Sequence, residues 1–249
     1  TLRRFDLRPA LLSVVGQDPE GIELIKAAEL LDLNTNFLYR SDDLPTDQYM
    51  AIEGSKGMIA AIADAHSLEA AGDKILAPLE NGRLGTTEKP FEGLIALDGN
   101  LTLALLAQIA TSPLFKKSDL RIAPASPGKA ERLLPLLGHT GATLYVNVEE
   151  AELLCQQNFS DAQMAAQTLV ARGSSRVLVT HGPKVAALAN SQGCVSAAPP
   201  AVIASRVTGA GDTFMGAHIA AELRGLRGVA ALQFASNAAA AYVSGKLGG

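Results

Sequence analysis

The alternation of short apolar segments with longer helical segments constrains the fold of this 249-residue chain more than any other feature. The pattern is regular from Leu94 onward. Strands are predicted at 94–97, 120–123, 143–146 and 176–180. Helices are predicted at 101–109, 130–137, 151–155, 160–171 and 213–224. Short apolar strands separated by helices indicate a mostly parallel sheet that is covered on both faces.

The first quarter of the chain predicts a different arrangement. The apolar run 10–15 ends in Gly16, and a turn then leads into an amphipathic segment at 22–33, so a strand and a helix are expected. Residues 48–52 and 58–63 predict two strands joined by a short, turn-rich loop. Parallel strands need a longer connection, so this pair forms an antiparallel hairpin. The length suits one main domain with one sizeable core.

Composition excludes several classes of protein. The net charge of −4 arises from basic and acidic residues mixed along the chain, which argues against a nucleic-acid surface. The apolar runs are far shorter than the ~20 residues of a membrane-spanning helix, and the first residues lack the apolar core of a secretory signal. We therefore expect a soluble, cytoplasmic protein. Cys155 and Cys194 have no partners at metal-ligand spacing and are expected to be core thiols.

The segment that carries most chemical information is Thr208-Gly209-Ala210-Gly211-Asp212. Its small residues permit a tight turn, and the N-terminus of the helix that follows offers backbone N–H groups to an anion such as phosphate. A carboxylate beside a phosphate would repel it, unless Asp212 is there to accept a proton from an attacking hydroxyl. The alternative is an ordinary loop in which Asp212 caps the helix.

Two other nucleotide-binding classes are disfavoured. The chain contains no Gly-x-x-x-x-Gly-Lys-[Ser/Thr] loop, and no Gly-x-Gly-x-x-Gly follows the first strand. A Walker-type ATPase and an ordinary dinucleotide dehydrogenase are therefore not expected.

Thr208 to Thr213 resembles the C-terminal signature of the ribokinase-like (PfkB) carbohydrate and nucleoside kinases. Other segments resemble this family in the same order, over nearly the whole length. They are the Gly-x-Asp-x-x-Gly turn at 16–21, the hairpin at approximately 44–63, Asn147-Val148-Glu149-Glu150, Thr180-His181-Gly182, and the small-residue helix at 234–240. The resemblance implies one kinase domain over 1–249, with a three-layer α/β/α fold, a mostly parallel central sheet and a small antiparallel β lid.

The resemblance also implies roles for individual residues. Asp212 would be the general base, and the backbone N–H groups of Gly209, Ala210 and Gly211 would form an anion hole. ATP and Mg²⁺ are the implied cofactors. Asn147 and Glu150 would position the metal, largely through water, whereas the residues of the nucleotide site would be Thr180, Gly182, Thr208 and Asn237.

The acceptor side is carried by segments around Thr46, Asp98 and Ser126, which within the family are most similar to pseudouridine kinases. The resemblance implies phosphorylation of pseudouridine to pseudouridine 5′-phosphate, with Thr46 and Asp98 approaching the sugar or base. Ribose, fructose and adenosine are alternative acceptors, and both residues are alternatively simple turn residues. Two further alternatives are a truncated homologue that binds nucleotide without catalysis and an unrelated α/β binding protein.

Two departures from the family pattern bear on function. Relatives carry an N-terminal segment that holds substrate hydroxyls, and Thr1 to Phe5 resembles the helix just after it, so sugar binding is expected to be weakened. Arg206 stands where relatives have Asp or Asn beside a monovalent cation, so K⁺ activation is expected to be weak or absent. Relatives often dimerise through the lid, where the apolar residues of this chain are Tyr49, Ile52, Met58 and Ile62.

Overall fold

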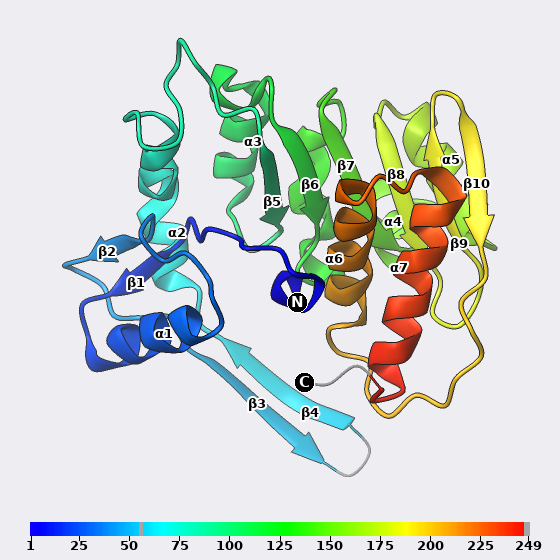
Figure 1. The fold of residues 1–249 in the computed structure, drawn as a ribbon, viewed down its shortest axis with the longest axis horizontal. Coiled ribbons are helices and arrows are strands. Elements are labelled where there is room, and N and C mark those ends of the chain that lie inside the picture. Colours follow the sequence, from blue (N-terminus) through cyan, green and yellow to red (C-terminus); the bar gives the residue numbers. More distant parts are fainter. Residues whose placement is uncertain (55–56, 247–249) are drawn as a thin grey trace.

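A computed structural model describes residues 1–54 and 57–246 of the chain. Its centre is a six-stranded sheet in the order β10-β9-β8-β7-β6-β5 (Figure 1). Strands β5 to β8 are parallel, and β9 and β10 are antiparallel to their neighbours. The bounds are β5 Leu94–Asp98, β6 Asp119–Ala123, β7 Ala142–Asn147, β8 Arg176–Thr180, β9 Ala186–Asn190 and β10 Gly193–Ala197. The predicted parallel strands are confirmed, whereas β9 and β10 were not predicted.

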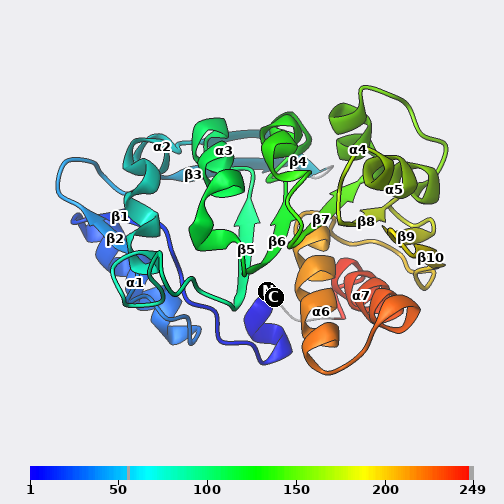
Figure 2. The same cartoon turned by 90° about the horizontal axis from the view of Figure 1, so that it is seen from above.

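Helices cover both faces of this sheet (Figure 2). One face carries α3 Leu103–Thr111, η3 Pro113–Phe115, η4 Pro127–Leu136, α4 Val148–Cys155 and α5 Ala162–Ala171. The other face carries η1 Leu2–Phe5, α6 Ala210–Leu223 and α7 Gly228–Val243. The three-layer arrangement predicted from the alternating pattern is confirmed.

The side chains of the central strands alternate between the two faces. Leu144 and Val146 of β7 pack into the core beneath α3 to α5. Tyr145 points the other way, into a second core that includes Phe214 and Ala217 of α6. Because both faces are buried, the strands are apolar at nearly every position, as the sequence indicated.

The segment predicted as a helix at 130–137 is instead a 3₁₀ helix, η4. Pro135 lies inside it and has no N–H to donate to an α-helical hydrogen bond. Pro127 opens the same element. The tighter 3₁₀ form suits so short a segment that contains two prolines.

A second, two-stranded sheet lies at the side of the molecule. In it, β1 Val14–Gly16 pairs in parallel with β2 Tyr39–Ser41, and the crossover is α1 Pro19–Leu30. Asp18 caps α1 by accepting a hydrogen bond from the N–H of Gly21. Two further helices, α2 His66–Ala71 and η2 Gly72–Leu79, lead back to β5.

The predicted hairpin is confirmed as β3 Tyr49–Gly54 and β4 Gly57–Ala63, which pair in antiparallel fashion. It projects from the body of the molecule (Figure 1). Tyr49, Met50, Ile52 and Ile62 are each more than half exposed. The side chain of Met58 lies outside the described residues.

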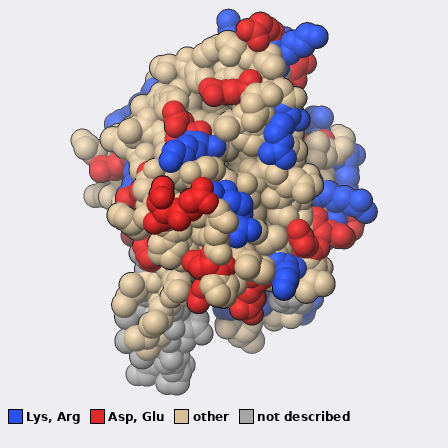
Figure 3. Space-filling view, turned by 90° about the vertical axis from the view of Figure 1, so that its left-hand side faces the viewer, with Lys and Arg blue, Asp and Glu red and all other residues tan. Residues whose placement is uncertain are grey.

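Charges of both signs are interspersed on the face shown in Figure 3. In the described part of the chain, no helix combines the length and apolar character needed to cross a bilayer. Cys155 is buried and burial raises the pKa of its thiol, as expected of a core residue, whereas Cys194 is only partly buried. Neither cysteine forms a disulfide.

Candidate functional site

The orientation of α6 places its N-terminus at the carboxyl ends of the parallel strands. Glu222, near the end of α6, forms ion pairs with Arg176, the first residue of β8, and with Arg121, the third residue of β6. The C-terminal end of α6 therefore meets the amino ends of the strands, and its N-terminal end lies at the opposite edge. The lid hairpin extends from that same side of the molecule (Figure 1). Ligand sites of open parallel sheets occur at this edge.

The turn before α6 depends on Gly209. This residue is the N-cap of α6 and has φ +87°, a left-handed conformation that costs a glycine little. A Cβ at this position would lie 2.7 Å from the hydroxyl of Tyr242. Both the backbone conformation and the space therefore require glycine here.

The backbone N–H groups of this turn are not equivalent. The N–H of Ala210 donates to the carbonyl of Val207 (3.0 Å), so it is already engaged, contrary to the expectation that it lines the anion hole. Within the described residues, the N–H groups of Gly209, Gly211 and Asp212 donate to no protein acceptor. These are orphan donors of a helix N-terminus, and a phosphate oxygen bound at this end of α6 would accept hydrogen bonds from them.

Asp212 is the third residue of α6 and not its cap, which is Gly209, so the reading of Asp212 as an ordinary N-cap is wrong. Its side chain is exposed, and its carboxylate forms no hydrogen bond or ion pair with the described residues. Thr213, the next residue, is buried and its hydroxyl donates to the carbonyl of Gly209 (2.8 Å). The carboxylate therefore projects from a fixed helix end toward solvent, where an acceptor hydroxyl has access to it.

Asn147 and Glu150 form a capping box at the start of α4. The Asn147 side chain accepts from the N–H of Glu150 (2.8 Å), and the Glu150 carboxylate accepts from the N–H of Asn147 (2.8 Å). Burial raises the pKa of Glu150, although the N–H of Asn147 opposes this. Among the residues that the structure describes, no three acidic, cysteine or histidine side chains gather as a metal cage. One buried carboxylate with an amide suits Mg²⁺ that is held through water and substrate phosphates.

The remaining residues predicted for the nucleotide site lie on three elements. Thr180 ends β8 and is the register partner of Asn147 on β7, so these two are direct neighbours. Gly182 follows with φ +54° in the turn before β9. Asn237 is exposed on α7, where its side-chain oxygen accepts a hydrogen bond from Gln233 (2.9 Å).

The two residues predicted for the acceptor lie in different settings. Asp98 ends β5 and is exposed, and its carboxylate accepts from the N–H of Asn100 (2.8 Å). Three strand spacings separate β5 from β8, so Asp98 lies roughly 14 Å from the Thr180 end of the site.

Thr46 is buried, with 6% of its surface exposed. Its hydroxyl donates to Asp18 (2.5 Å) and accepts from the N–H of Gly16 (3.0 Å). The Thr46 N–H also donates to Asp18, and these donors lower the pKa of that carboxyl. Thr46 therefore joins the end of β1 to the segment that leads into the lid. Contact of its hydroxyl with an acceptor stays a prediction.

A buried charged network at the other end of α6 was not predicted. Glu222 accepts from Arg121 (2.6 Å) and from both terminal nitrogens of Arg176 (2.7 and 3.1 Å). Arg121 also binds Asp119 through two hydrogen bonds (2.6 and 2.7 Å). Charged residues at the start of a strand were the available signal, but the sequence did not indicate which partners they meet.

His218 and Tyr145 complete this network. The Tyr145 hydroxyl accepts from Arg121 (2.9 Å) and lies within hydrogen-bonding distance of Nδ1 of His218 (2.9 Å). His218 is fully buried, and burial lowers its pKa to about 4. The imidazole is therefore neutral at neutral pH, and its Nε2 has no partner among the described residues.

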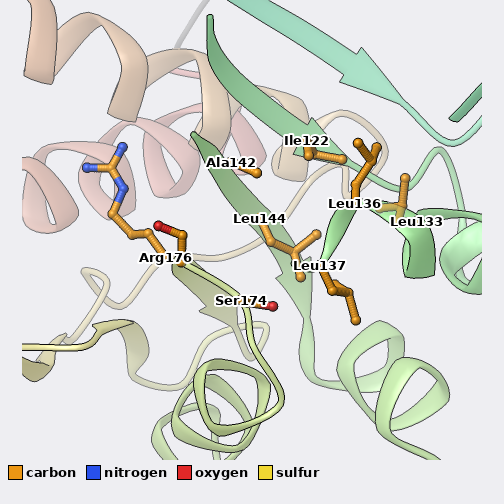
Figure 4. A pocket seen from close by; sticks show the side chains of 9 residues that line it. Ile122, Leu133, Leu136, Leu137, Ala142, Leu144, Ser174 and Arg176 are labelled. Atoms are coloured by element: carbon orange, nitrogen blue, oxygen red, sulfur yellow. The ribbon is translucent and has the colours of Figure 1, made fainter. Parts of the chain in front are cut away.

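A small apolar cavity lies away from the candidate site (Figure 4). It is lined by side chains of η4 and of the amino-terminal ends of β7 and β8, including Leu133, Leu136 and Ala142. Its volume of about 10 Å³ admits no more than roughly one water molecule. It is a packing defect of the core and no substrate site.

Comparison with known proteins identifies the family of the chain. The sequence model of the pfkB family carbohydrate kinases matches residues 1–248. A search of curated proteins finds no match.

Similar solved structures share the fold at low sequence identity. A carbohydrate kinase from Agrobacterium tumefaciens has a TM-score of 0.75 at 23% identity, covering 96% of this chain and 76% of that one. Ribokinase from Thermotoga maritima has a TM-score of 0.78 at 20% identity, covering 98% and 77%. Adenosine kinase from Schistosoma mansoni, in complex with 2-fluoroadenosine, has a TM-score of 0.76 at 19% identity, covering 98% and 76%. The chain therefore has the ribokinase-like α/β fold and belongs to the pfkB family of carbohydrate kinases, which are ATP-dependent phosphotransferases.

Proposed function

We propose that this protein transfers the γ-phosphate of ATP to a hydroxyl of a nucleoside or sugar, with Asp212 as the general base. The observation that carries the proposal is the exposed Asp212 carboxylate beside the orphan N–H groups of Gly209, Gly211 and Asp212 at the start of α6. This arrangement places a proton acceptor next to a site for the transferred phosphoryl group.

In the proposed reaction, Asp212 accepts the proton of the acceptor hydroxyl as its oxygen forms a bond to the γ-phosphorus. The bond from that phosphorus to the bridging oxygen breaks, and ADP leaves. The orphan N–H groups stabilise the negative charge on the transferred group, an effect often worth several kcal/mol. Mg²⁺, when bound, neutralises charge on the phosphates, and Asn147 and Glu150 would hold it through water.

Pseudouridine is the acceptor we favour, because the segments around Thr46, Asp98 and Ser126 are most similar to pseudouridine kinases. The adenosine kinase among the similar structures was solved with a nucleoside, which supports a nucleoside as readily as a plain sugar. Thr180, Gly182, Thr208 and Asn237 are proposed to line the nucleotide site.

The lid supports a further proposal, a homodimer formed through the hairpin. Met50, Ile52 and Ile62 lie on one face of the hairpin, where they are 51–66% exposed and form an apolar surface on two adjacent strands, whereas Tyr49 lies on the opposite face. Light scattering should give twice the monomer mass for the wild-type protein. Met50→Lys together with Ile62→Lys should give the monomer mass, and an unchanged mass would exclude this interface.

The acceptor is tested by measuring ATP consumption with Mg²⁺ against pseudouridine, ribose, fructose, adenosine and uridine. The proposal predicts turnover with pseudouridine that Asp212→Asn abolishes. Asp73→Asn, which alters an exposed carboxylate on η2, is the matched control and should leave turnover unchanged. Turnover with another acceptor would reassign the substrate. Nucleotide binding without turnover of any acceptor would favour a non-catalytic homologue.

A further inference from the structure

We infer that Tyr242, near the end of α7, is a positioning residue that holds the Thr208–Gly209 turn, and with it the orphan N–H groups of the proposed anion site. This inference rests on the proposed function, which assigns those N–H groups to the binding of the transferred phosphoryl group. Tyr242 itself makes no proposed contact with the reacting atoms, so it is not a catalytic residue.

The first contact is a hydrogen bond to the turn itself. The Tyr242 hydroxyl donates to the carbonyl of Thr208 (3.0 Å). The same oxygen lies 2.7 Å from the position that a Cβ of Gly209 would occupy, so it packs directly over that residue. The hydroxyl thus contacts two successive residues, Thr208 and Gly209, and free N–H groups follow at Gly211 and Asp212 in the first turn of α6.

The second set of contacts involves the residues just before the turn. The guanidinium of Arg206 lies 3.9 Å from the centroid of the Tyr242 ring, and its Nε donates to the Tyr242 carbonyl (3.0 Å). The N–H groups of Ser205 and Arg206 donate to the carbonyl of Val243 (2.7 and 3.2 Å). Hydrogen bonds and a cation–π contact therefore join this loop to the last turn of α7.

The loop lies largely on the surface of the protein. Residues 201–205, 207 and 208 are exposed. Apart from the bond between the Val207 carbonyl and the N–H of Ala210, the hydrogen bonds found between residues 199–208 and other described elements go to Tyr242 or Val243. By contrast, α7 itself is held by buried side chains such as Leu232 and Ala235. Removing the Tyr242 hydroxyl therefore perturbs the loop and leaves the core of the protein intact.

A loosened turn should affect the chemical step more than binding. Orphan N–H groups stabilise charge only where they point at the transferred group, and small misplacements of catalytic geometry are costly. The acceptor is proposed to bind at the lid and at β5, on other elements. Tyr242→Phe should therefore lower kcat and leave the acceptor KM nearly unchanged.

The experiment compares wild type, Tyr242→Phe and a matched control, Tyr39→Phe. Tyr39 lies on β2, and its hydroxyl has no hydrogen-bond partner among the described residues. Amide hydrogen exchange over residues 205–212 reports the turn directly, without any requirement for activity. Steady-state kinetics with the acceptor identified above reports the chemical step.

We expect Tyr242→Phe to speed exchange in this segment several-fold and to lower kcat roughly tenfold, the scale of one hydrogen bond. The acceptor KM should stay within about twofold, and Tyr39→Phe should match wild type in both measurements. Unchanged exchange would overturn the inference, and so would faster exchange with unchanged kcat. If wild type itself transfers no phosphate, the proposed function fails, and the exchange result alone decides whether Tyr242 holds the turn.

Discussion

Replacing Glu222 by Gln is expected to destabilise the fold strongly, because this carboxylate compensates two arginines between α6 and the sheet. Its side chain is 8% exposed, and that of Arg121 is 6% exposed. Burial favours the protonated acid, but Arg121 and Arg176 together outweigh this and hold the pKa of Glu222 below its ordinary value. The carboxylate is therefore ionised in the fold at neutral pH.

The structure sets the magnitude of the loss. Removing one partner of a buried ion pair costs about 3–5 kcal/mol, since the other charge stays buried without compensation. Arg121 retains two hydrogen bonds to Asp119, and the side chain of Arg176 is 24% exposed and reaches water. Both facts place the expected loss at the lower end, at about 3 kcal/mol.

Equilibrium urea unfolding measures this loss as the change in the free energy of unfolding. The matched control is Glu92→Gln, which breaks the ion pair between Glu92 and Lys117. This pair has the same length as the pair of Glu222 with Arg176 (2.7 Å), but both of its side chains are at least 60% exposed. Water and salt screen this exposed pair, so its loss should have little effect on the free energy of unfolding. An equal loss of unfolding free energy in the two variants would refute the claim that the buried network holds α6 to the sheet, provided that the dependence of this free energy on urea concentration is unchanged.

Four further outcomes follow from the same structure. The pKa of His218 falls from an ordinary value of 6.5 to about 4 on folding, so as pH is lowered the imidazole is protonated in the unfolded chain before it is protonated in the folded one. The free energy of unfolding should therefore decline as pH falls from about 6.5 to about 4, by up to roughly 3 kcal/mol. In unfolding measured against pH, His218→Gln should remove most of that decline. Gly209→Ala should lower both Tm and kcat, because its Cβ would meet Tyr242 and φ would remain positive; a variant with wild-type kcat would contradict the turn geometry. Turnover in KCl and NaCl should agree within about twofold, because Arg206 supplies positive charge beside the turn, and strong K⁺ activation would refute this. Thr46→Val should cost about 1–3 kcal/mol in urea unfolding, since it leaves the buried N–H of Gly16 without its acceptor, and a loss near zero would count against the proposed joint between β1 and the lid.

The parts of the fold that local patterns determine were predictable. The apolar segment 143–146 lies within β7, and a helix does begin at the small residues before Asp212, with Ala210 as its first residue. A candidate site at the N-terminus of α6 could also be proposed from the sequence, because the spacing of glycines and an acidic residue is local. The paired strands β9 and β10 were missed, since both are short and rich in small residues that carry no clear period.

What the sequence could not indicate depends on contacts between distant residues. Arg121 and Glu222 are 101 positions apart, and nothing local to either one predicts their pairing. The engagement of the Ala210 N–H by Val207 depends on the detailed geometry of the turn. The contact of Tyr242 with Thr208 likewise requires the packing of α7 against the loop, which tertiary structure alone determines.

The most direct test of the account is transfer of radiolabelled γ-phosphate from ATP to an acceptor by wild type and by Asp212→Asn, together with calorimetric binding of Mg²⁺-ATP to both. The account predicts that Asp212→Asn loses at least about 10²-fold in the rate of transfer and still binds nucleotide, because only the proton acceptor has been removed. An Asp212→Asn enzyme that transfers phosphate within a few-fold of the wild-type rate would contradict it.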